Sequence, residues 1–227
     1  MLVALTRERG RNDTLRSLIA GRAEVVEVPL TATDFRSLLD VEADIRATAK
    51  WGEFRSLVVT STRCERYVAP AGAALAHDAR VYSVGPATSD VLRRAGWAVT
   101  HESPDSALDL ADVLAEGPVL ILGAVEGREE LWSVLRERGR DPYRIGCYRT
   151  RGVTLDPPDR ATIGRADVVF IGAPSAWRIA RDLVGARAWV VVPGATTRDA
   201  VAGDHPRVLV GWGADFEAAW RTLNGAA

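Results

Sequence analysis

The chain has 227 residues, of which 47% are hydrophobic and 26% charged, and its formal net charge is −1. So small a net charge gives no electrostatic support to a general nucleic-acid role, and we expect no nucleic-acid partner. No apolar run approaches the roughly 20 residues of a membrane helix, and no export signal is visible, so we expect no membrane association.

Short apolar runs alternate with amphipathic segments along the chain. The expected strands lie, in order, at residues 1–6, 24–28, 56–61, 80–84, 117–123, 167–172, 188–193 and 207–211. Helical patterns that begin near Ser, Thr or Asp and end at Gly lie at 13–21, 88–96, 105–117, 126–139 and 175–185. Because most strands are apolar on both faces, they suit parallel sheets covered by helices. The alternation predicts a doubly wound α/β fold.

Two stretches of the chain repeat one pattern, in which a strand leads through Gly-x-x-Thr into a helix. The first reads RVYSVGPATSDVLRRAG and the second ARAWVVVPGATTRDAVAG, so Gly85 aligns with Gly194 and Thr88 with Thr197. Each is preceded by another strand, a small or hydroxyl-rich turn and a helix. The chain therefore resembles two related α/β units.

The two units need not be consecutive in sequence. Residues 27–35 and 146–158 are extended in pattern, contain threonine and lack helical periodicity. They predict a pair of connecting strands, near 29–35 and 147–155. Domain one is then 1–30 plus 153–227, and domain two is about 35–147. The alternative interpretation is two ordinary surface loops.

The Gly-x-x-Thr junctions are candidate anion sites. Ligands of open parallel sheets bind outside the carboxyl ends of the strands, where the first helical turn offers N–H groups and partial positive charge. Gly85 allows close approach of the backbone and Thr88 adds a hydroxyl. Other hydroxyl-bearing residues occupy equivalent strand ends: Ser61, Thr62, Ser175, Thr196 and Thr197. Any one of them has the alternative role of a simple helix cap.

Several classes of chemistry leave no trace in the sequence. There is no Walker lysine motif, no G-x-G-x-x-G after the first strand and no G-x-S-x-G turn. Three scattered histidines lack zinc spacing, and two cysteines, Cys64 and Cys147, lack metal or redox spacing. We therefore expect no metal or cofactor, and a reducing, cytoplasmic setting. An enzyme built this way would fold and position a reactive substrate and exclude water.

In order and spacing, the motifs of the chain resemble the uroporphyrinogen-III synthase family over nearly its whole length. The motifs are VVTS, SVGPATSDVLRRAG, VLILGAVEGREELWSVLRERG with CYRT, ADVVFIGAPSAW and VPGATT. The resemblance implies two α/β domains joined by a two-stranded β-ladder, with the active site in the interdomain cleft and no cofactor. It implies a lyase of heme biosynthesis that cyclises hydroxymethylbilane, a linear tetrapyrrole with eight carboxylates, to uroporphyrinogen III. The last pyrrole ring is inverted through loss of water and a spiro intermediate.

The resemblance also implies roles for individual residues. Tyr148 matches a family tyrosine proposed to assist loss of the hydroxyl, and a phenol is a plausible proton donor to it. Thr88 and Thr197 match helix-start threonines that we expect to bind carboxylates. Further candidates for substrate binding are Gly85, Gly194, Thr196, Ser61, Thr62, Ser175, Arg7, Arg63 and Arg149. The chain departs from the family at Gly172 and Ala173, where a Thr-Ser pair is common.

The expected partners are the tetrapyrrole substrate and, through it, the preceding enzyme, hydroxymethylbilane synthase. We expect a monomer, because no sustained apolar surface stripe is visible. Two rival interpretations stay open at this point. One is a non-catalytic tetrapyrrole- or anion-binding sensor on the same scaffold, and the other is an unrelated two-domain protein that binds sugars or nucleotides.

Overall fold

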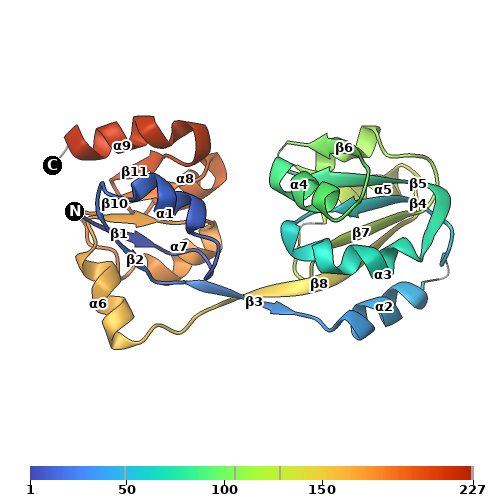
Figure 1. Ribbon diagram of the computed structural model, residues 1–227, viewed down its shortest axis with the longest axis horizontal. Coiled ribbons are helices and arrows are strands. Elements are labelled where there is room, and N and C mark those ends of the chain that lie inside the picture. The colour runs from blue at the N-terminus through green and yellow to red at the C-terminus, as the bar shows by residue number, and fades with distance from the viewer. Residues whose placement is uncertain (49, 105, 128, 226–227) are drawn as a thin grey trace. The chain divides into compact units, whose positions relative to one another are not determined.

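The computed structural model describes residues 1–48, 50–104, 106–127 and 129–225. Positions 49, 105, 128, 226 and 227 fall in the expected domains, and 105 and 128 in expected helices, but they lie outside the described residues. Contacts within the chain divide it into two units (Figure 1). Unit 1 comprises Met1–Thr33 and Thr150–Ala227, and unit 2 comprises Asp34–Arg149.

Unit 1 contains a five-stranded sheet in which every pair of neighbours is parallel. Its order is β11 (Val208–Val210), β10 (Trp189–Val192), β9 (Val168–Phe170), β1 (Leu2–Leu5) and β2 (Glu24–Glu27). The strand order reverses between β1 and β9, and such a switch point is where doubly wound sheets bind ligands. The prediction of parallel α/β sheets is confirmed.

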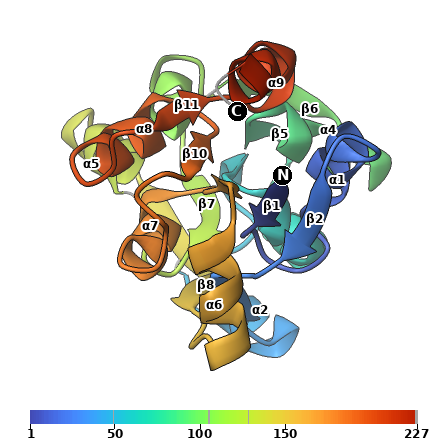
Figure 2. The ribbon, with the colours of Figure 1, turned by 90° about the vertical axis from the view of Figure 1, so that its left-hand side faces the viewer.

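Helices cover both faces of this sheet because each carries an apolar stripe at helical spacing. On one face lie α1 (Asp13–Ile19) and α9 (Phe216–Gly225). The first buries Leu15 and Ile19, and the second buries Phe216, Trp220 and Leu223. On the other lie α6 (Pro157–Arg165), α7 (Pro174–Ala180) and α8 (Ala195–Ala202) (Figure 2). Strand residues such as Val3 and Ala4 alternate between these two cores.

The sheet of unit 2 has six strands. Its order is β3 (Thr31–Phe35), β8 (Pro142–Gly152), β7 (Val119–Ala124), β4 (Phe54–Val59), β5 (Leu75–Val84) and β6 (Val99–Ser103), and it is parallel from β8 to β6. Beside β8, the N–H of Arg36 donates to the carbonyl of Cys147 (3.0 Å), and that of Val153 to Leu30 (2.9 Å). Because one residue number falls as the other rises, β3 and β8 run antiparallel.

Two separate cores flank the sheet of unit 2. The first is covered by α2 (Leu38–Arg46), the 3₁₀ helix η1 (Thr62–Tyr67), α3 (Val68–Gly72) and α4 (Pro86–Arg94). The second is covered by η2 (Ala107–Asp112) and α5 (Glu130–Glu137). The strand order reverses between β4 and β7, which places a switch point at the ends of these two strands.

The prediction of a helix over 105–117 is wrong, because the described part of this segment, 106–117, forms only the short 3₁₀ helix η2. The Ser103 hydroxyl donates to the Ser106 carbonyl and lies 3.0 Å from the Asp109 carboxylate, while Ser106 accepts from the Leu108 N–H (3.1 Å). Such side-chain bonds offer the backbone an alternative to the α-helix. Over the described residues, no helix has both the length and the apolar character needed to cross a membrane. A last 3₁₀ turn, η3 (Gly213–Asp215), precedes α9.

Candidate functional site

The two Gly-x-x-Thr junctions form the starts of α4 and α8, as the alignment predicted. Gly85 and Gly194 are the N-cap residues, and Thr88 and Thr197 each lie three residues later, buried to 4% and 5% exposure. Thr196 precedes Thr197 on an exposed position of the same turn. The glycines differ in conformation. Gly85 has φ 78°, which favours glycine, whereas Gly194 is fully extended, which any residue can adopt.

The backbone N–H groups of the two junctions are used differently. At α4, the Gly85 N–H donates to the Ser103 carbonyl (2.7 Å), and the Thr88 N–H donates to the Gly85 carbonyl (3.0 Å). At α8, the first turn is closed by Arg198, whose N–H donates to Gly194 (3.0 Å). The N–H groups of residues 195–197 precede that bond and have no acceptor within the helix. The start of α8 is therefore the stronger candidate for an anion site.

In unit 1, Arg7 follows β1 at the switch point and stacks on an aromatic ring. Its guanidinium carbon lies 5.2 Å from the ring centroid of Trp212. A Cβ at Gly172 would lie 3.2 Å from Trp212 and 3.3 Å from Arg7, so a larger residue there would require this pair to shift slightly. Ala173 is the N-cap of α7 and gives no side-chain cap, and Ser175 lies half-buried in the first turn.

In unit 2, the candidate residues Ser61, Thr62 and Arg63 follow β4, and Arg149 lies in β8. The Ser61 hydroxyl accepts from the N–H of Arg63 (3.2 Å), so it caps η1 as in the alternative interpretation of this residue. Thr62 begins η1 and is half-buried. Arg149, by contrast, is exposed and forms a surface ion pair with Glu126 (2.8 Å), a type of contact that adds little stability.

Tyr148 lies in β8 at a β-bulge. Gly146 pairs with Gly123 of β7, and the next pair is Tyr148 with Ala124, so Cys147 is the extra residue. The tyrosine is buried to 7% exposure, and its ring centroid lies 5.5 Å from the guanidinium carbon of Arg63. The positive charge therefore faces the aromatic ring of the candidate proton donor.

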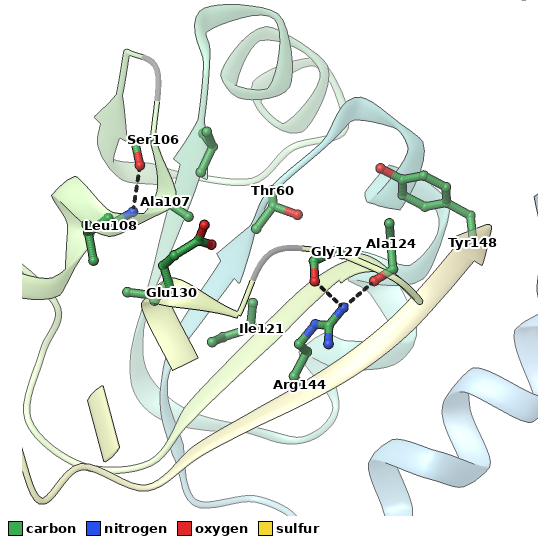
Figure 3. A pocket seen from close by; sticks show the side chains of 13 residues that line it. Thr60, Ser106, Ala107, Leu108, Ile121, Ala124, Gly127, Glu130, Arg144 and Tyr148 are labelled. Carbon is green, nitrogen blue, oxygen red and sulfur yellow. Dashed lines mark hydrogen bonds between the residues drawn. The ribbon is translucent and has the colours of Figure 1, made fainter. Parts of the chain in front are cut away.

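A cavity of about 490 Å³ opens at the carboxyl ends of β4, β5 and β7, beside Tyr148 (Figure 3). Its volume lies within the range of small-molecule sites. The walls are mainly apolar, with a few polar groups. The lining residues are Thr60, Val84, Ser106, Ala107, Leu108, Ile121, Gly123, Ala124, Gly127, Glu130, Leu131, Arg144 and Tyr148. Of the residues expected from the sequence to bind or react with substrate, Tyr148 lines this cavity.

The polar lining residues Thr60, Glu130 and Arg144 were not expected from the sequence. Arg144 Nη2 donates to the carbonyls of Ala124 (2.9 Å), Val125 (2.8 Å) and Gly127 (3.0 Å). The Thr60 hydroxyl donates to the Leu122 carbonyl (3.0 Å). The position of Thr60 at the end of β4 could have identified it as a site residue. No local sequence pattern identifies Arg144, because its partners lie on β7 and the loop that follows it.

Two buried thiols lie close to Tyr148. Cys64 and Cys147 are both free and fully buried. The hydrogen bond between the two thiols and the burial of Cys64 both raise the pKa of Cys64 well above the ordinary thiol range. The thiol of Cys64 therefore stays protonated and unreactive at neutral pH.

Known proteins resemble this chain in sequence family and in fold. Residues 14–212 match the family model described as uroporphyrinogen-III synthase HemD. The fold is similar to a mutant uroporphyrinogen III synthase from the bacterium Thermus thermophilus (TM-score 0.68, 16% identity, 99% of each chain). It is also similar to uroporphyrinogen-III synthetase from Helicobacter pylori (TM-score 0.66, 14% identity, 100% of this chain and 99% of that chain). The search of curated proteins gave no match. Since the family model covers most of both units, the chain belongs to the uroporphyrinogen-III synthase family.

Proposed function

We propose that Tyr148 and the helix starts of both units carry out the reaction of the family to which this chain belongs. That reaction is the cyclisation of hydroxymethylbilane to uroporphyrinogen III, with inversion of the last pyrrole ring. Tyr148 donates its phenolic proton to the departing hydroxyl, which leaves as water and creates an electrophilic azafulvene. The substituted carbon of the last ring attacks it, and the spiro intermediate then fragments and recloses as the inverted isomer.

The observation that carries the proposal is the place of Tyr148 beside a mainly apolar cavity. Arg144 shares its Nη2 hydrogens among three carbonyls, and Glu130 brings a negative charge, so the cavity does not suit a carboxylate. It suits an uncharged pyrrole ring, whose N–H could donate to an acceptor such as Glu130. The ring that loses its hydroxyl would then lie next to the phenol.

The carboxylates of the substrate require donors elsewhere. In unit 1, the N–H groups at the start of α8, the hydroxyls of Thr196, Thr197 and Ser175, and the Arg7 guanidinium are suitable donors. In unit 2, Thr88, Thr62 and Arg63 lie at the carboxyl edge of the sheet. Backbone amides and hydroxyls bind carboxylates without requiring a net positive chain, which fits the formal charge of −1.

The test is turnover of freshly prepared hydroxymethylbilane, followed by oxidation and separation of the uroporphyrin isomers. The natural chain should give mainly isomer III, and Tyr148→Phe should lower kcat at least about tenfold because a proton donor is lost. Tyr143→Phe is the matched control, since this hydroxyl of the same strand lies 3.4 Å from Asp141 at the exposed surface. Equal turnover in Tyr148→Phe and Tyr143→Phe would remove Tyr148 from the mechanism.

The same assay separates the enzyme from the non-catalytic sensor. A sensor would bind a tetrapyrrole without raising the yield of isomer III above that of spontaneous closure. The match of the family model over residues 14–212 favours the enzyme.

The cellular setting is also part of the proposal. The substrate is unstable, so we expect it to be taken up soon after its release by hydroxymethylbilane synthase. We expect a monomer, which sedimentation would report as a mass near 24.5 kDa. The two free, buried thiols support a cytoplasmic location.

A further inference from the structure

We propose that Arg144 and Arg36 are positioning residues that hold the bulge at Cys147 and thereby aim the phenol of Tyr148. The inference rests on the proposed role of Tyr148. Neither arginine needs to touch the substrate, because both act on the backbone on either side of this tyrosine.

The bulge determines where the tyrosine points. In a regular strand, consecutive side chains alternate between the two faces of the sheet. Here Cys147 and Tyr148 are consecutive, yet both join the core formed by α2, η1, α3 and α4. The extra residue makes Tyr148 pair with Ala124 at the end of β7. Bulges of this kind re-aim side chains beside active sites.

Arg144 holds the bulge from the side of β7. Its guanidinium binds the carbonyls of Ala124, Val125 and Gly127, and its Nη1 donates to Glu129 (3.1 Å). The loop bound by Arg144 also contacts the tyrosine directly, because its Val125 N–H donates to the Tyr148 carbonyl (2.7 Å). Figure 3 shows the hydrogen bonds from the Arg144 head group to Gly127 and Ala124.

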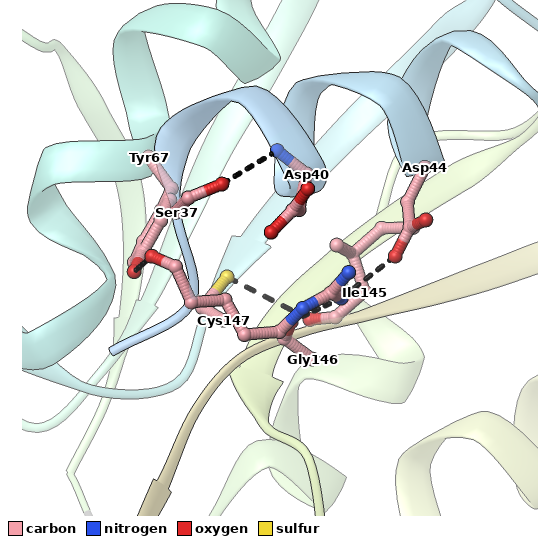
Figure 4. A network of polar contacts seen from close by, with 8 residues as sticks. Ser37, Asp40, Asp44, Tyr67, Ile145, Gly146 and Cys147 are labelled. Atoms are coloured by element: carbon pink, nitrogen blue, oxygen red, sulfur yellow. Dashed lines mark hydrogen bonds and ion pairs between the residues drawn. The ribbon is translucent and has the colours of Figure 1, made fainter. Parts of the chain in front are cut away.

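Arg36 directly follows β3, which pairs with β8 on the side away from β7. Figure 4 shows its partners Asp44, Gly146 and Cys147. Its N–H donates to the Cys147 carbonyl (3.0 Å), and its Nη1 donates to the Gly146 carbonyl (2.9 Å) and to Asp44 (2.7 Å). The Tyr67 hydroxyl donates to the Arg36 carbonyl (2.6 Å), which fixes the backbone of Arg36 itself. The carbonyls of residues 146 and 147 therefore accept hydrogen bonds from Arg36, and that of residue 148 accepts one from Val125.

The fit leaves little freedom around the bulge. A side chain at Gly146 would start 2.9 Å from the Cα of Val125, and one at Gly127 would start 3.2 Å from Arg144 Nη2. A planar guanidinium with five N–H donors can serve several carbonyls at once, whereas a lysine ammonium is a single point of charge. Arg144→Lys should therefore retain only part of the kcat that is lost in Arg144→Ala.

The experiment is a double-mutant cycle between each arginine and Tyr148, read as kcat. Arg144→Ala and Arg36→Ala should each lower kcat about tenfold, with KM changed less than about threefold, because misplacement of a reacting group affects the chemical step. In the Tyr148→Phe background the same substitutions should have almost no further effect. Arg55→Ala, which removes an exposed ion pair with Asp78 at the opposite end of β4, should leave kcat unchanged.

Amide hydrogen exchange gives a readout that does not depend on activity. The Val125 N–H should exchange at least about tenfold faster in Arg144→Ala than in Arg55→Ala, and at an intermediate rate in Arg144→Lys. Unchanged exchange would overturn the proposal. An equal loss of kcat in both backgrounds would also overturn it while leaving Tyr148 in the mechanism. A Tyr148→Phe variant of full activity would instead reject the proposed function itself.

Discussion

Thr88 and Thr197 occupy the same position in their two units, three residues after the N-cap glycine of α4 and of α8, and both are buried. A threonine buried in a first helical turn places its hydroxyl beside the N–H groups of that turn. The two residues thus present similar chemistry at the carboxyl edges of two sheets. The difference is that α4 has already used the N–H groups of Gly85 and Thr88.

This difference predicts unequal effects of the same substitution. Thr88→Val and Thr197→Val keep the buried shape and remove the hydroxyl, so each should raise KM for hydroxymethylbilane with little change in kcat. We expect about a tenfold effect at Thr88, where the hydroxyl is the main donor, and about threefold at Thr197, where amides remain. Steady-state kinetics measure both values. A fall in kcat with unchanged KM would contradict a role in substrate binding.

The two N-cap glycines give a matched pair for stability. Gly85→Ala should destabilise the fold by about 1–3 kcal/mol, because φ 78° with ψ 144° is a region that essentially only glycine adopts. Gly194→Ala should change stability by less than about 1 kcal/mol, since that residue is extended and nothing lies within 4 Å of the added Cβ. Urea unfolding at constant m-value measures both. Similar losses in the two variants would contradict the conformational argument.

The sequence predicts the sheets well because strands buried on both faces are apolar throughout. Residues 56–61 and 117–123 became β4 and β7, and the Gly-x-x-Thr repeat marked the two helix starts correctly. The edge strand β6 was not expected, because Val99–Ser103 is largely polar and only one strand pairs with it. The bulge at Cys147 and the contacts of Arg144 depend on register with another strand, which no local pattern contains.

The ion pair of Glu27 predicts a pH dependence of stability. Hydrogen bonds from Arg16, and secondarily from Asn12, hold the pKa of Glu27 below its ordinary value. Between the folded and unfolded pKa values the unfolded state binds more protons, so stability rises with pH there. The contribution is present above about pH 4.3 and is lost as pH falls through the folded pKa.

Glu27→Gln should therefore lower the free energy of unfolding at pH 7, by no more than about 1 kcal/mol because Arg16 is exposed. The gap between variant and natural chain should shrink as the pH is lowered below about 4. Glu24→Gln, at the other end of β2, is the control for the loss of one charge. A gap that stays constant from pH 7 to pH 3 would show that the pairing of Glu27 contributes nothing.

The buried thiols beside Tyr148 report on opening of the first core of unit 2. Cys64 and Cys147 are fully buried, and the pKa of Cys64 is raised by its hydrogen bond with Cys147 and by burial. Iodoacetamide should therefore add nothing to the native chain at pH 8 within minutes, and should add two groups in urea, as intact mass would show. Because labelling requires η1 to separate from β8, its slow native rate measures that opening. Rapid labelling of Cys147 in the native chain would mean that the bulge opens freely, and a tyrosine carried on such a segment could not be held in one direction.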